Sequence, residues 1–133
     1  MEKSMFLEYR SNKAEIIELR DRLDHLNEYE LEEAVVSDVI NDYRKGYAQP
    51  TSITGIDYSR VSRLRSKYVM RILKLQSDCC DVEEAINDIE DSLTRRIIRS
   101  YFVEGINQQR IALKVHMDQS VVSRRIRKFI DSI

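Results

Sequence analysis

The chain has 133 residues, of which 34% are charged, and its formal net charge is −1. This length allows one ordinary domain with an appendage and excludes a large catalytic architecture. Only three Gly and one Pro occur, so we expect an all-α protein. No apolar run is long enough to span a bilayer, so we expect the protein in the cytoplasm with no membrane partner.

The average charge hides a division along the chain. From Ser92 onward there are nine basic and three acidic residues, so this part carries +6 and the rest of the chain −7. A basic carboxy-terminal part of this kind indicates a surface that faces nucleic acid.

Residues 1–57 are predicted to form an N-terminal helical hairpin and an ordered loop. The apolar residues of the first helix recur at alternating three- and four-residue steps: Ile16, Leu19, Leu23 and Leu26. This helix is expected to end near Asn27, beside His25, and a second is expected from about Tyr29 to Arg44. Gly46 then opens a segment that holds the only Pro, which favours an ordered connector, with a recognition loop as the alternative.

Residues 58–90 are predicted to form a long coiled-coil-like helix. Its apolar residues follow a heptad-like step: Ile72, Leu75, Cys79, Val82, Ile86 and Ile89. A seam of this length needs a partner, either the N-terminal helices folded back or the same helix of a second chain. Five of these residues are therefore candidates for oligomerisation, in a homo-oligomer with a dimer favoured: Ile72, Leu75, Val82, Ile86 and Ile89. Cys79 and its neighbour Cys80 diverge on a helix, and Cys79 is expected to pack in the seam.

Residues 91–133 are predicted to form a three-helix unit that contains a helix-turn-helix. Its helices are expected at Asp91–Phe102, Gln108–Val115 and Gln119–Phe129, with a core made of Ile97, Tyr101, Ile111, Val115, Met117, Val122, Ile126 and Phe129. Ala112 is small enough for two helices to cross closely. His116 stands at the turn, where the backbone tends to a positive φ that His tolerates better than most residues.

The outer face of the last helix is short, polar and basic. Four residues are candidates for contacts to base edges: Gln119, Ser120, Ser123 and Arg124. Four more are candidates for phosphate contacts: Asn107, Arg110, Arg127 and Lys128. The alternative interpretation is a solvated surface helix with no ligand.

The segment IEDSLTRRIIRSYFVEGINQQRIALKVHMDQSVVSRRIRKFI is similar to the carboxy-terminal DNA-binding region of bacterial sigma factors. With the preceding helices and the loop DYRKGYAQPTSITGIDYS, the chain resembles the ArpU/RinA-type regulators of phages of Gram-positive bacteria. The resemblance implies a phage or prophage transcriptional regulator that binds double-stranded DNA.

The leading hypothesis is therefore a sequence-specific DNA-binding transcriptional regulator. One alternative is a phage DNA-packaging subunit of the small-terminase kind, and another is an interaction protein that binds RNA polymerase or a host factor. No catalytic set, phosphate loop or metal-ligand spacing is present in the sequence, so we expect no enzyme activity, no metal and no cofactor.

Overall fold

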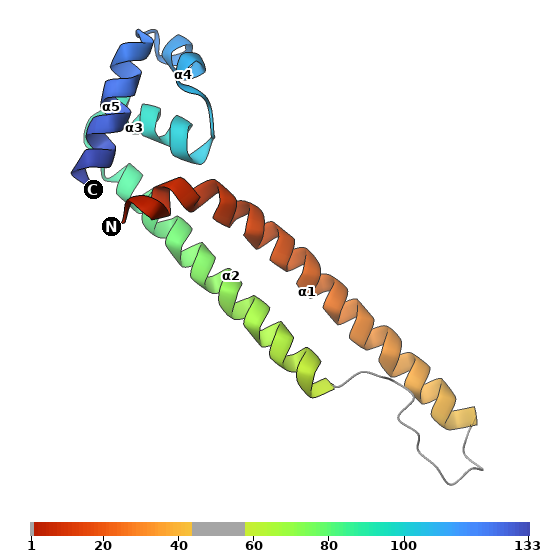
Figure 1. Ribbon diagram of the computed structural model, residues 1–133. Helices are drawn as coiled ribbons and strands as arrows, with labels where there is room; N and C mark the ends of the chain where they lie inside the picture. The colour runs from red at the N-terminus through yellow and green to blue at the C-terminus, as the bar shows by residue number, and fades with distance from the viewer. Residues whose placement is uncertain (1, 44–57) are drawn as a thin grey trace. The chain divides into compact units, whose positions relative to one another are not determined.

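The described part of the chain is helical in all of its regular structure, which confirms the all-α prediction (Figure 1). The computed structural model describes the backbone of residues 2–43 and 58–133, and the side chains of residues 2–27 and 58–133. The helices are α1 (Lys3–Tyr43), α2 (Tyr58–Asn87), α3 (Ser92–Ile98), the π-helix η1 (Arg99–Val103), α4 (Gln108–Val115) and α5 (Gln119–Ser132). Within these ranges, no helix combines the length and the apolar character needed to cross a bilayer. The predicted loop after Gly46 lies outside the described residues.

The first helix is continuous, and the predicted break near His25 is wrong. Helix α1 runs from Lys3 to Tyr43. This stretch contains neither Gly nor Pro, so no residue removes a helical hydrogen bond or supplies a left-handed turn. The His25 ring takes part in the helix surface, because its Nδ1 donates to the backbone oxygen of Asp21 at 2.8 Å. The N-terminal part is therefore one long helix rather than a hairpin.

Helix α2 ends three residues earlier than predicted. It stops at Asn87, and Ile89, which was expected to continue the seam, is half-buried in the turn before α3. Asp91 is the N-cap of α3, since its carboxylate accepts from the backbone amide of Thr94 at 3.0 Å. An acidic side chain interacts unfavourably with the dipole at the carboxy end of a helix and favourably with the dipole at the amino end. The acidic residues after Asn87 therefore favour the end of α2 and the start of α3.

The chain divides into two units, and both long helices contribute to each. One unit comprises Met1–Ile16 and Lys74–Ile133, and the other comprises Ile17–Leu73. The predicted segment 91–133 lies within the first unit, together with the start of α1 and the end of α2. In the second unit Leu19 and Ile72 are buried, and Arg65 Nε donates to Asn27 Oδ1 at 3.0 Å.

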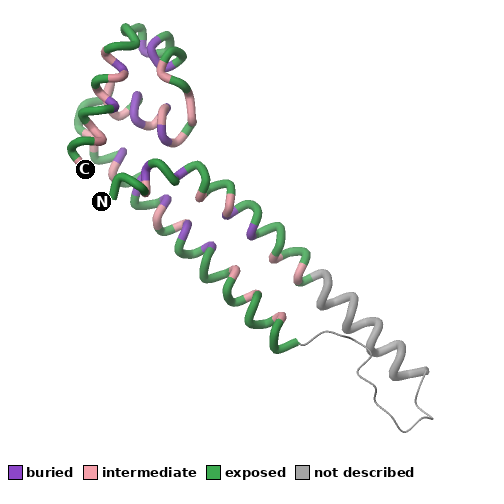
Figure 2. The backbone as a smooth tube through the Cα atoms, in the orientation of Figure 1, coloured by how far each residue is buried: buried purple, intermediate pink, exposed green. Residues whose placement is uncertain are grey.

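In the first unit the seam of α2 packs against the chain's own first helix (Figure 2). Cys79, Val82 and Ile86 are at most 2% exposed, and the burial of Cys79 confirms its predicted place in the seam. The Tyr9 hydroxyl donates to the Glu83 carboxylate, and burial together with this carboxylate raises the pKa of Tyr9. The residues predicted for oligomerisation in this unit, Leu75, Val82 and Ile86, are thus buried within a single chain.

Three phenylalanine rings join the start of α1 to the helix-turn-helix. The Phe6 ring meets Phe102 at 5.6 Å and Phe129 at 5.2 Å between centroids, both edge to face. Phe6 is 2% exposed, so it belongs to the core of the first unit. The predicted core omitted Phe6, although Phe6 and Tyr9 extend upstream the apolar spacing seen at Ile16.

Most of the predicted core of the three-helix unit is buried. Ile97, Ile111 and Val122 are fully buried, and Ile98 and Phe102 join them. Ala112 is buried, as expected for a residue at a close helix crossing. Met117 was expected in the core and is 42% exposed instead, because the left-handed residue before it ends the helical register of α4.

Candidate nucleic-acid interface

The first helix of the candidate interface, α4, is held at both ends by side chains. Asn107 is its N-cap, since the Asn107 Oδ1 accepts from the backbone amide of Arg110 at 2.9 Å. Near the other end, Lys114 Nζ donates to the buried hydroxyl of Ser100 at 3.0 Å and lies 3.4 Å from the Glu104 carboxylate. Lys114 therefore anchors α4 to the segment around η1, whereas Arg110 is exposed.

The segment around η1 carries the connection between α3 and α4. The backbone amide of Glu104 donates to Arg99 O at 3.1 Å, a bond across five residues that widens the helix, and Ile106 N donates to Ser100 O at 2.9 Å. Gly105 follows with φ 68°, a conformation that favours glycine. A Cβ at Gly105 would lie 2.2 Å from Arg10 Cζ, so the guanidinium of α1 covers this turn.

The turn between α4 and α5 depends on one left-handed residue. His116 has φ 57° and ψ 43°, as expected from its place in the motif, and the amide of Met117 donates to Ala112 O at 3.0 Å. Asp118 then precedes α5 as its N-cap and makes no side-chain capping bond. The result is a tight connection between two helices, on which Ala112 and Val122 are buried.

The left-handed conformation of His116 leads to a prediction about stability. Replacing His116 with Gly should raise the free energy of unfolding by about 0.5–1 kcal/mol, because Gly has no Cβ to be crowded at positive φ. His116→Ala keeps the Cβ and should give no gain. Urea unfolding of the three proteins measures the difference, and a gain for Ala equal to that for Gly would contradict the explanation.

Helix α5 presents most of its predicted base-contact residues to solvent. Gln119, Ser120 and Arg124 are exposed, whereas Ser123 is half-buried. Of the predicted phosphate contacts, Asn107, Arg110, Arg127 and Lys128 are all exposed, although the Asn107 side chain is already engaged as a cap. Within the described residues, neither Arg124 nor Arg127 forms an ion pair. The exposed face therefore carries basic groups that an anionic ligand can reach.

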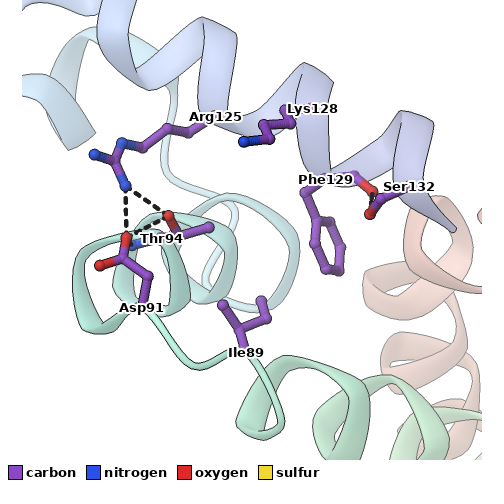
Figure 3. A pocket seen from close by; sticks show the side chains of 7 residues that line it. All are labelled: Ile89, Asp91, Thr94, Arg125, Lys128, Phe129 and Ser132. Carbon is purple, nitrogen blue, oxygen red and sulfur yellow. Dashed lines mark hydrogen bonds and ion pairs between the residues drawn. The ribbon is translucent and has the colours of Figure 1, made fainter.

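The inner side of α5 is fastened to the start of α3 by a polar contact that the sequence interpretation did not include (Figure 3). The Arg125 guanidinium donates to the Asp91 carboxylate and to the Thr94 hydroxyl, the latter at 2.7 Å. Asp91 also accepts from the amide and the hydroxyl of Thr94. These hydrogen bonds from Thr94, followed by the Arg125 contact, lower the pKa of the Asp91 carboxyl. Arg125 therefore orients α5 and is not part of its outer face.

Beside this contact lies an open pocket of about 460 Å³ between α3 and α5 (Figure 3). Ile89 and Phe129 give it an apolar part, and Lys128 stands at its rim. Lys128 thus lies at the edge of the outer face of α5, next to α3. Among the exposed cations of this helix, Arg124 and Arg127 are the better placed for a ligand on the outer face.

Within the described residues, no group of three or more His, Cys, Asp or Glu side chains is arranged to hold a metal ion. Comparison of the chain with protein-family models, with curated proteins and with solved structures gives no match. The interpretation of this surface therefore depends on its own geometry and charge.

Proposed function

We propose that the chain is a sequence-specific DNA-binding transcriptional regulator in which α5 enters the major groove of double-stranded DNA. The proposal is supported by one observation above all. Two helices joined by a tight left-handed turn expose, on the second helix, Ser120, Arg124 and Arg127, with no acidic residue between Gln119 and Lys128. An α-helix fits into the major groove, where Arg donates two hydrogen bonds to guanine and short polar side chains reach base edges.

Each exposed group takes a role that follows from its chemistry. Arg124 is the candidate for a bidentate contact to guanine, and Gln119 and Ser120 contact neighbouring bases. Arg127 and Arg110 bind phosphates, which sets the register of the helix on the duplex. Asn107 caps α4 and thereby fixes the position of the start of this helix. The backbone amides that remain free at this helix start add a site for a phosphate.

The proposal includes a homo-oligomer, with a dimer favoured, and a phage or prophage origin. A single small module contacts too little DNA for strong binding on its own, and a dimer doubles its phosphate contacts. Because Leu75, Val82 and Ile86 are buried within one chain, a contact between chains uses another surface unless α1 leaves α2.

The experiment that tests the proposal compares two arginine variants on selected and scrambled duplexes. Duplexes are first selected from a randomised pool by the wild-type chain, and affinities are then measured by fluorescence anisotropy across a salt series. Arg124→Ala should cost about 1–3 kcal/mol on the selected duplex and relax the preference at one base pair. Arg127→Ala should weaken binding to both duplexes alike and reduce the salt slope by about one.

A matched control is Arg96→Ala, which removes an exposed guanidinium from α3 in the same unit. It should leave both affinities unchanged. Failure of the pool to yield any preferred duplex would count against sequence-specific binding. Equal losses for Arg124→Ala and Arg96→Ala would count against the assignment of α5 as the helix that reads the bases.

A further inference from the structure

The pocket between α3 and α5 lies in the first unit and is not used by the DNA-binding proposal. One of its walls is a side of α5, on which four residues follow one another at three-, one- and three-residue steps: Arg125, Lys128, Phe129 and Ser132. Ser120, Arg124 and Arg127, which are assigned to DNA, do not line it. The pocket therefore lies on a different side of α5 from the surface that is proposed to meet DNA.

The apolar part of the pocket is held in place by residues outside it. Ile89 and Phe129 come from opposite walls, and both are half-buried, so each keeps surface that a ligand can contact (Figure 3). Arg95 Nη1 donates to the backbone oxygen of Ile89 at 2.8 Å. The Phe129 ring meets Phe6 edge to face at 5.2 Å. A ligand would therefore find this apolar surface already ordered, which reduces the entropic cost of binding.

The polar side chains of the pocket are engaged with one another, with one exception. The Thr94 hydroxyl donates to Asp91 at 2.6 Å and accepts from Arg125 at 2.7 Å. The Ser132 hydroxyl donates to a backbone oxygen of its own helix at 2.7 Å. The Lys128 ammonium has neither a hydrogen bond nor an ion pair within the described residues. Lys128 is therefore the polar group of this pocket that is available to a ligand.

The charge of the pocket favours a ligand with a single negative charge. Asp91 and Arg125 are paired and cancel, so Lys128 leaves the lining with one net positive charge. Asp131, three residues after Lys128, neither lines the pocket nor forms an ion pair with it. A phosphorylated ligand would bring excess negative charge close to the Asp91 carboxylate. The lining therefore favours a monocarboxylate over a nucleotide or a DNA phosphate.

The size of the pocket and its surroundings indicate a small molecule rather than a protein. Its volume of about 460 Å³ lies within the range of small-molecule sites, about 300–1,000 Å³. A stable protein partner usually covers about 800 Å² on each side, with an apolar centre. No large apolar residue of α3 or α5 is exposed beyond the pocket, so these two helices offer no such area.

We propose that the pocket between α3 and α5 binds a small monocarboxylic acid with an apolar body. The carboxylate accepts a hydrogen bond from the Lys128 ammonium, and the apolar body lies against Ile89 and Phe129. The apolar contact supplies most of the affinity, while the charge selects an acid over a neutral molecule of the same shape. Because it contacts both walls, the acid links the turn before α3 to the carboxy-terminal part of α5.

The test titrates three probes into the ¹⁵N-labelled full chain and follows the amide signals by NMR. Octanoate carries both the charge and the apolar body, octanamide has the same shape without the charge, and acetate has the charge without the apolar body. Octanoate should bind with a Kd on the order of 0.1–1 mM. Octanamide should bind about fivefold more weakly, and acetate at least about tenfold more weakly.

Three variants assign the binding to this pocket. Lys128→Met keeps the length of the side chain and removes its charge, so it should weaken octanoate about fivefold and make octanoate and octanamide bind alike. Ile89→Ala should weaken both ligands about threefold through lost apolar contact. The control Arg96→Met removes the same charge from an exposed position of α3 outside the pocket and should leave the affinity for octanoate unchanged.

Three results would overturn the proposal. Octanoate and octanamide could bind the wild-type chain equally, or Lys128→Met and Arg96→Met could weaken octanoate equally. The shifted amides could also be spread over the exposed cations of the chain, instead of being confined to residues 88–95 and 124–133. The same spectra show whether each variant keeps its fold. None of these measurements uses DNA, so the outcome is independent of the DNA-binding proposal.

Discussion

Replacing Phe6 with Ala should lower the free energy of unfolding by about 3–5 kcal/mol, although the residue lies in the first turns of a surface helix. The Phe6 ring is 2% exposed and makes edge-to-face contacts with Phe102 and Phe129. Removing the Phe6 ring takes apolar contacts away from Phe102 and Phe129. It also leaves a cavity, which α1 can close only in part because its hydrogen-bonded helical backbone is rigid. Urea unfolding of the full chain, followed by circular dichroism, measures the loss.

The neighbouring residue supplies the control for Phe6. Leu7 is 71% exposed on the same turn of α1, so Leu7→Ala should change the free energy of unfolding by no more than about 0.5 kcal/mol. Phe6→Leu keeps an apolar side chain and should fall between the two. Losses of similar size at Phe6 and Leu7 would mean that the start of α1 does not pack on the helix-turn-helix.

Replacing Ile111 with Ala should lower the free energy of unfolding by about 2–5 kcal/mol. Ile111 is fully buried on α4. The substitution removes three carbon atoms from a packed core, and α4 has only eight residues with which to adjust. Thermal and urea unfolding both measure the effect.

The same helix provides an unusually close comparison. Leu113 is an isomer of Ile111, lies two residues further along α4 and is 77% exposed. Leu113→Ala should therefore cost no more than about 0.5 kcal/mol. A large loss at Leu113 in solution would show that this side chain is covered by something other than the rest of its own chain.

The parts of the fold that depend on neighbours in sequence could be predicted from the sequence. The Asn107 cap, the burial of Ala112 and the left-handed His116 all follow from residues within one or two helical turns. The exposure of Ser120 and Arg124 follows from the period of the helix alone. Whether these exposed residues bind DNA stays a prediction, because exposure and charge are shared by many solvated helices.

The parts that depend on distant residues could not be predicted. Nothing near Phe6 in sequence indicates that Phe102 and Phe129 form its surroundings. In the same way, α2 ends at Asn87 because Asp91 caps the start of α3. The spacing of the apolar residues does not indicate where one helix ends and the next begins. Val82 and Ile86 are buried within a single chain, which is one of the two arrangements that the heptad spacing allowed.

The aromatic cluster has a consequence for the order of folding. Phe6 leaves the ribosome early and Phe129 late, so the core of the first unit closes only after nearly all of the sequence is available. Contacts between residues so far apart carry a loop-closure entropy that local helices do not, and they slow the approach to the native state. Until that closure, helices α4 and α5 have an open apolar side, and a nascent chain that stalls before Phe129 exposes this side to chaperones and proteases.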